Sequence, residues 1–144
     1  AIDWTSYHAS ARTLLDDPFF WGPADDHAPV GNDTGADILE SYRSWRRRRK
    51  KDVSGAIAYV ERILEEWEML ESGNETALLV RDEAFIALAF SQAMLDGEIA
   101  NDVSSRALAA IDRQMPLATR WPQPESRRTT LEKMRAKLEA LRVL

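Results

Sequence analysis

Apolar side chains recur at three- and four-residue steps along most of the chain, which is the spacing of an α-helix. One such face carries Ile38, Leu39, Tyr42 and Trp45. It predicts a helix over residues 34–48, capped by Asn32 or Asp33. A longer stripe from Ala56 to Leu70 predicts a second helix. This one would begin at Asp52 or Ser54, run to about Glu71 and end at Ser72-Gly73-Asn74.

The segment from Glu75 to Asp96 is the most apolar stretch of the sequence. Its apolar residues cover most of a helix circumference, which predicts a central helix buried on several sides and closed by Gly97. Asn101 or Asp102 can cap a further helix that ends at Met115. A last helix, over about residues 125–144, has an apolar stripe of Leu131, Met134, Leu138 and Leu141. This stripe packs on its own domain or forms the seam of a homodimer.

At the start of the chain, the pattern from Asp3 to Leu15 predicts a short helix with Asp3 as its cap. A loop rich in glycine and proline follows over residues 18–32. No segment has the alternation that a β-strand requires. We therefore expect an all-α fold: a compact single domain over residues 1–144, a bundle of five or six helices with a long ordered loop near the N-terminus.

The composition excludes several classes of function. The 144 residues hold 24 acidic and 19 basic side chains, a net charge of −5, so a nucleic-acid partner is not expected. Without cysteine there are no disulfides, thiolate metal sites or cysteine nucleophiles. No apolar run reaches the length of a membrane span, and the first residues do not resemble a signal peptide. We expect a cytoplasmic protein that holds no cofactor.

The loop and the helix start after it carry an acidic cluster with one histidine. Its members are Asp25, Asp26, His27, Asp33 and Asp37. Carboxylate and imidazole groups of this kind bind Ca²⁺, Mg²⁺ or Zn²⁺, and a carboxylate pair beside a histidine can support metal-assisted hydrolysis. The spacing matches no EF-hand loop. The alternative is structural: Asn32 or Asp33 caps the helix, and the aspartates before them shape a turn.

A basic run and a tryptophan are candidates for contact with a partner. Arg46, Arg47, Arg48, Arg49 and two lysines are consecutive, and they can bind phosphates or an acidic protein face. They also fall at the predicted end of a helix, where cations are locally favourable, so the run can equally be a solvated helix end. Trp121 lies in a proline-rich loop, either as a plug on the core or as an exposed anchor.

Two blocks of the sequence resemble a known group. The first is Phe20-Trp21 with Asp25-Asp26, Ala28-Pro29 and the run Gly31-Asn32-Asp33-Thr34-Gly35-Ala36-Asp37; the second extends from Asp82 to Phe90 with Gly97-Glu98-Ile99. Between Phe19 and Met115 the chain resembles small uncharacterised bacterial proteins that are related to the C-terminal part of molybdate metabolism regulators. This resemblance implies no reaction. Molybdate binding does not follow from it, because an acidic loop does not attract an oxyanion.

Two functions are compatible with these residues. The first is a non-enzymatic module for protein–protein interaction of the immunity-protein or antitoxin kind, since a small acidic helical domain suits the neutralisation of a basic partner. The second is a metal-binding protein or metal-assisted hydrolase that uses the acidic residues of the segment 25–37. We favour the first, because helix capping and turn formation already account for the acidic side chains.

Overall fold

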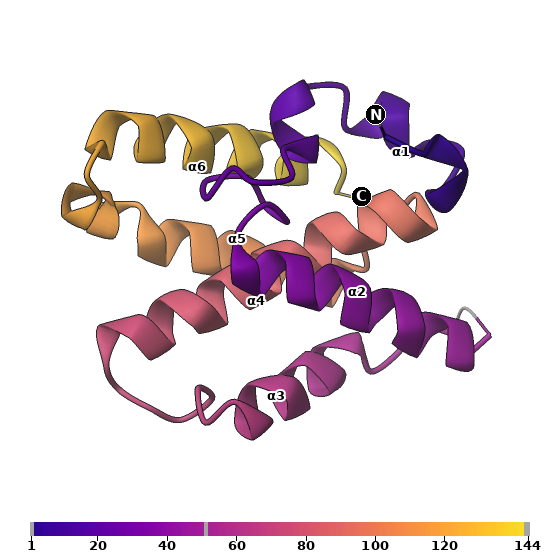
Figure 1. The fold of residues 1–144 in the computed structure, drawn as a ribbon, viewed down its shortest axis with the longest axis horizontal. Helices are drawn as coiled ribbons and strands as arrows, with labels where there is room; N and C mark the ends of the chain where they lie inside the picture. The colour runs from indigo at the N-terminus through magenta and orange to yellow at the C-terminus, as the bar shows by residue number, and fades with distance from the viewer. Residues whose placement is uncertain (1, 51, 143–144) are drawn as a thin grey trace.

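The computed structural model describes residues 2–50 and 52–142, and its regular elements are all helical (Figure 1). The α-helices are α1 (Ala11–Leu14), α2 (Asp33–Arg48), α3 (Ala56–Glu66), α4 (Glu75–Asp96), α5 (Asn101–Gln114) and α6 (Pro124–Ala140). Short 3₁₀ turns are η1 (Trp4–Ser6), η2 (Pro18–Trp21) and η3 (Pro116–Arg120). The expected all-α bundle is confirmed. In the part of the chain that is described, no helix is long and apolar enough to cross a membrane.

Helix α4 is the centre of the molecule, as its sequence predicts. Every residue from Ala84 to Leu95 is buried. Helices α1, α2, α3 and α5 all contact it, and Figure 1 shows it crossing the middle of the bundle with α3 below and α6 above. The apolar stripe of α6 joins the same core: Leu131, Met134 and Leu138 are buried within this chain, where α6 packs against α5.

The single helix predicted for the first fifteen residues is wrong. The structure has the turn η1, an extended Tyr7 and then the one-turn helix α1. The Asp3 carboxylate accepts hydrogen bonds from the Thr5 amide (3.1 Å) and from the hydroxyls of Thr5 (2.6 Å) and Ser6 (3.2 Å). These local bonds compete with those of a continuous helix. The amide of His8 is also taken out of the helix, because it donates to the carbonyl of Met94.

Helix α3 ends five residues earlier than its apolar stripe predicts. Its last turn closes with the amide of Glu68 on the carbonyl of Glu65 (3.0 Å) and the amide of Met69 on the carbonyl of Leu64 (2.8 Å). This pair of bonds is the Schellman arrangement, in which the residue after the helix adopts a left-handed conformation and is usually glycine. Here Glu68 takes that conformation (φ +61°). A glutamate at this position gave no stop signal in the sequence.

The other predicted helix ends are partly confirmed. The Asn32 side chain accepts the amide of Gly35 (2.7 Å) and so caps α2, and Gly97 closes α4 with φ +74°. The cap predicted for α5 at Asn101 or Asp102 is wrong, since the residue before the helix is Ala100. Its amide donates to the side-chain carbonyl of buried Gln92 on α4 (3.0 Å), so a tertiary contact replaces a local cap.

The left-handed glutamate gives a stability prediction. Glu68→Gly should raise the free energy of unfolding by about 1 kcal/mol, because a side chain at positive φ is strained and glycine is not. Urea unfolding measures the change. Glu71→Gly is the matched control: it removes an exposed glutamate from the same connection at an ordinary φ, and should leave stability equal or slightly lower. A loss of stability in Glu68→Gly would contradict the strain.

Candidate functional site

The loop between α1 and α2 is pinned to the core at its start. Asp17 accepts the amide of Phe19 and so begins the turn η2. Phe20 stacks on Phe90 of the central helix, with ring centroids 5.3 Å apart. The Trp21 indole N–H donates to the carbonyl of Leu15 (2.7 Å). Aromatic packing therefore fixes the start of the loop that carries Asp25 and Asp26.

Two glycines allow the rest of this loop to fold tightly. A Cβ on Gly31 would lie 2.4 Å from the carbonyl oxygens of both Gly22 and Asp25. A Cβ on Gly35 would lie 2.3 Å from the carbonyl oxygen of Pro29. Neither position has room for a side chain, because the close neighbour is backbone. The two glycines and the Asn32 cap thus explain, in packing terms, much of the Gly31–Asp37 motif.

The acidic side chains of the loop act locally. Asp25 accepts the amide of His27 (2.9 Å), which forms a turn. Asp26, Asp33 and Asp37 are exposed, and Asp33 occupies the first turn of α2, where a negative charge suits the helix dipole. Throughout the ranges 2–50 and 52–142, no three histidine or acidic side chains come close enough to hold a metal ion.

His27 instead faces a small chamber between the loop, α4 and α6. The chamber is about 10 Å³ and is lined by His27, Asn32, Glu83 and Arg127 together with apolar side chains. Arg127 is only 2% exposed. Its guanidinium lies over the ring of Trp121 (4.1 Å), and the imidazole of His27 contacts the same ring (5.0 Å). Trp121 is therefore a half-buried partner of these two side chains, closer to the predicted plug than to an exposed anchor.

The charges around this chamber are costly to bury. Desolvation raises the pKa of Glu83 to about 7, and the nearby Asp26 and Asp33 add to the rise, although Arg127 opposes it. Burial also lowers the pKa of the Arg127 guanidinium, and Glu83 counters that shift. Among the described residues, His27 Nδ1 and Arg127 Nε are buried without a hydrogen-bond partner. The cluster thus combines two shifted pKa values with two buried nitrogens that lack a hydrogen-bond partner.

Sequence reasoning missed Glu83 and Arg127, although each left a signal. Glu83 is a charge on the most apolar helix of the chain. Arg127 precedes Leu131 by four residues, so it lies on the apolar face of α6. A third buried charge, Asp82, accepts hydrogen bonds from Arg113 (2.6 Å) and Gln114 (2.7 Å) and ties α4 to α5.

The arginines of the basic run differ in their contacts with the rest of the fold. Arg46 donates to Asp96 (2.5 Å), which also accepts the Tyr42 hydroxyl (2.5 Å). Arg49 lies over the ring of Trp45 and donates to the carbonyls of Asp52 and Ser54. Arg46 is half-buried, whereas Arg47, Arg48 and Arg49 are exposed. Half of the four arginines thus hold α2 and its connection in place.

An acidic surface lies where α3 ends. Residues 63–80 contain five glutamates and neither lysine nor arginine. Glu75 pairs with Arg120, whereas Glu65, Glu66, Glu68 and Glu71 are exposed and form no ion pair with any residue that the structure describes. Half-buried apolar side chains lie between these glutamates (Trp67, Met69 and Leu70) and in the first two turns of α4 (Leu78, Leu79 and Val80). We call residues 65–80 the acidic surface.

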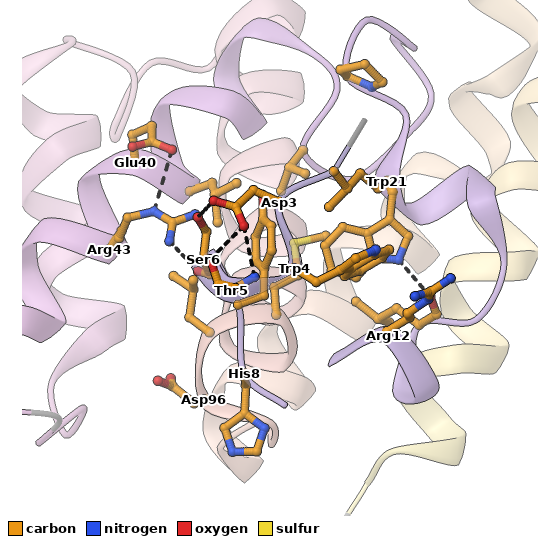
Figure 2. A pocket seen from close by; sticks show the side chains of 18 of the residues that line it. Asp3, Trp4, Thr5, Ser6, His8, Arg12, Trp21, Glu40, Arg43 and Asp96 are labelled. Carbon is orange, nitrogen blue, oxygen red and sulfur yellow. Dashed lines mark hydrogen bonds and ion pairs between the residues drawn. The ribbon is translucent and has the colours of Figure 1, made fainter. Parts of the chain in front are cut away.

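A wide hollow of about 1710 Å³ lies beside the N-terminal segment, which forms part of its wall (Figure 2). Its walls come from α2, the start of the acidic loop and the C-terminal end of α4. Trp4 and Trp21 line it and meet edge to face, and Arg12 and Arg43 flank them in the view of Figure 2.

Comparison of the chain with protein-family models, curated proteins and solved structures finds no match.

Glu83 gives a prediction about pH. Its folded-state pKa is raised from 4.5 to about 7, so its protonation favours the folded state below about pH 4.5, and that contribution is lost as the pH rises through 7. Between pH 5 and pH 8 the free energy of unfolding should fall by about 2–3 kcal/mol from this group alone. Glu83→Gln should lack this part of the fall. Denaturant titrations at several pH values measure it, with the exposed Glu132→Gln as control; parallel curves for wild type and Glu83→Gln would contradict the assignment.

The separation of the loop carboxylates gives a second prediction. Addition of Ca²⁺, Mg²⁺ or Zn²⁺ should leave the melting temperature equal to that in chelator, because a ligand stabilises a fold only by binding the folded state more tightly than the unfolded one. A rise in melting temperature that disappears in Asp26→Asn or Asp33→Asn would instead support a metal site in the loop.

Proposed function

We propose that this protein is a non-catalytic interaction module of the bacterial cytoplasm that binds a basic protein partner through the acidic surface. The observation that carries the proposal is the position of its charges. Glu65 and Glu66 are in the last turn of α3, and Glu68 and Glu71 follow directly. The C-terminal end of a helix already carries a partial negative charge. Four carboxylates at this end are therefore repelled by that charge and by one another.

The stability of the fold therefore gives no reason for this cluster. The basic run at the end of α2 is the opposite case, since its cations suit the helix dipole. Glu68 adds a second local cost, because it occupies a left-handed position that glycine would fill with less strain. Residues that oppose the local preferences of a fold are typical of functional sites.

The apolar side chains of the acidic surface supply the other half of an interface. Trp67 and Met69 are half-buried and pack against the core, so they are held in place while part of each remains accessible. A rigid apolar centre with a charged rim is the usual anatomy of a protein interface, and the rim charges select a partner of opposite sign. A basic protein whose activity must be blocked, as in immunity or antitoxin pairs, fits this surface.

Charge reversal on the acidic surface tests the proposal. The immobilised protein is used to capture basic proteins from an extract of its host cell, and the captured partner is then purified and titrated. The double variant Glu65→Lys/Glu66→Lys should weaken binding about tenfold or more, mainly at low salt. The variant should also be at least as stable as the wild type, because lysine suits a helix C-terminus, so loss of binding would not reflect unfolding.

Glu132→Lys/Glu139→Lys on α6 is the matched control, since it makes the same change of charge at two exposed positions elsewhere. The control should bind like the wild type. Equal binding by all three proteins would refute the proposed function. It would also be refuted if the wild type captured no basic protein that the first variant fails to bind.

A further inference from the structure

Arg127 is a buried charge that lacks the partners a buried charge normally has. It is 2% exposed and belongs to the same face of α6 as the buried Leu131 and Met134. Among the described residues its Nε atom has no hydrogen-bond partner. Glu83 stabilises the positive charge of Arg127 through space, without a hydrogen bond between the two side chains. Because buried polar groups in folded proteins are almost always hydrogen-bonded, Arg127 requires a further acceptor.

A second nitrogen with the same deficit belongs to the same chamber. In the described part of the chain, His27 Nδ1 is buried and without a partner, whereas Nδ1 of the exposed His8 accepts the amide of Ser10 (3.0 Å). The imidazole of His27 and the guanidinium of Arg127 both lie against the ring of Trp121, at 5.0 and 4.1 Å from its centroid. The loop and α6 thus bring two unpaired nitrogens to one place.

The chamber that these residues line has the size of a single water molecule. Its volume is about 10 Å³, and roughly 10–15 Å³ of such space is what one water needs. The other polar side chains of its wall are Asn32 and Glu83. Asn32 is already engaged, because its oxygen accepts the amide of Gly35 and its nitrogen donates to the carbonyl of Ala28. Glu83 is therefore the third polar group that a bound molecule would meet.

The charges of the wall select a neutral ligand. The guanidinium of Arg127 disfavours a cation, and the carboxylate of Glu83 disfavours an anion when it is ionised. A dipolar molecule that both donates and accepts hydrogen bonds satisfies both side chains. Cavities in proteins that hold no water are apolar, whereas this one is lined by a histidine, a glutamate and an arginine.

We propose that the chamber is a binding site for one ordered water molecule, which joins Arg127, His27 and Glu83. The water accepts from the Nε–H of Arg127 and donates one hydrogen to Nδ1 of His27, so the neutral imidazole carries its own proton on Nε2. The second hydrogen of the water binds the ionised carboxylate of Glu83. When Glu83 is protonated, its hydroxyl donates to the water instead, so the same molecule serves both states of the glutamate.

The water connects three segments that are distant in the sequence. His27 lies in the loop before α2, Glu83 on α4 and Arg127 on α6. Phe20 and Trp21 fix only the start of that loop, as described above. The bridging water holds its later part against the two helices. The chamber is separate from the acidic surface, so this inference does not depend on the proposed function.

A high-resolution crystal structure of the full chain tests the site directly. The expected result is one density peak in the chamber at hydrogen-bond distance, about 2.7–3.2 Å, from Arg127 Nε, His27 Nδ1 and a carboxyl oxygen of Glu83. A chamber without density, or one closed by direct contact between Glu83 and Arg127, overturns the proposal. A crystal soaked in sodium bromide separates water from a halide ion, and an anomalous signal in the chamber overturns the proposal as well.

Oxygen-17 relaxation dispersion provides a test in solution, because it counts the water molecules that stay bound for longer than the protein takes to tumble. Arg127→Met removes Nε and keeps most of the side-chain volume, so its dispersion should be smaller than that of the wild type by one water molecule. Arg128→Met is the matched control, since Arg128 is the next residue and pairs with the exposed Glu125. The control should equal the wild type.

Equal dispersion for Arg127→Met and Arg128→Met overturns the proposal. The crystal structure uses the wild type, so its result does not depend on the folding of either variant.

Discussion

The fold depends on the need to cover a helix that is apolar on nearly all sides. Because α4 is buried from Ala84 to Leu95, water must be excluded around its whole circumference, and the neighbouring helices can do this only by surrounding it. Amphipathic helices with one apolar face each suit that task. The positions of α2, α3 and α5 therefore follow from a single property of the segment that they enclose.

The polar groups of α4 determine how its neighbours are oriented. Asp82 binds Arg113 and Gln114 of α5, Gln92 accepts the amide that precedes α5, and Asp96 binds Tyr42 and Arg46 of α2. A buried polar group without a partner costs about 1–3 kcal/mol, so each of these bonds disfavours other packings of the same apolar faces. Glu83 differs, since it keeps a raised pKa beside a buried arginine.

Helical periodicity predicted the bundle and the central helix because burial repeats with the geometry of the helix itself. It failed where a contact between distant segments decides the backbone: the Met94 carbonyl that takes the His8 amide, and the Gln92 side chain that replaces the cap of α5. It also failed at Glu68, where the helix ends on a residue with no preference for that conformation. The chamber residues come from three separate segments, so no local pattern could join His27 to Glu83 and Arg127.

The tight loop around Gly31 and Gly35 affects what a shared sequence motif says about relationship to this chain. Both glycines are required by carbonyl oxygens that leave no space for a methyl group, and Asn32 is required by the helix start. A motif with these causes is a property of the scaffold, so proteins that share it can be expected to share this loop while differing in what they recognise. Differences in function within such a group would then lie at the end of α3, where the exposed carboxylates of Glu65, Glu66, Glu68 and Glu71 form no ion pair with any described residue.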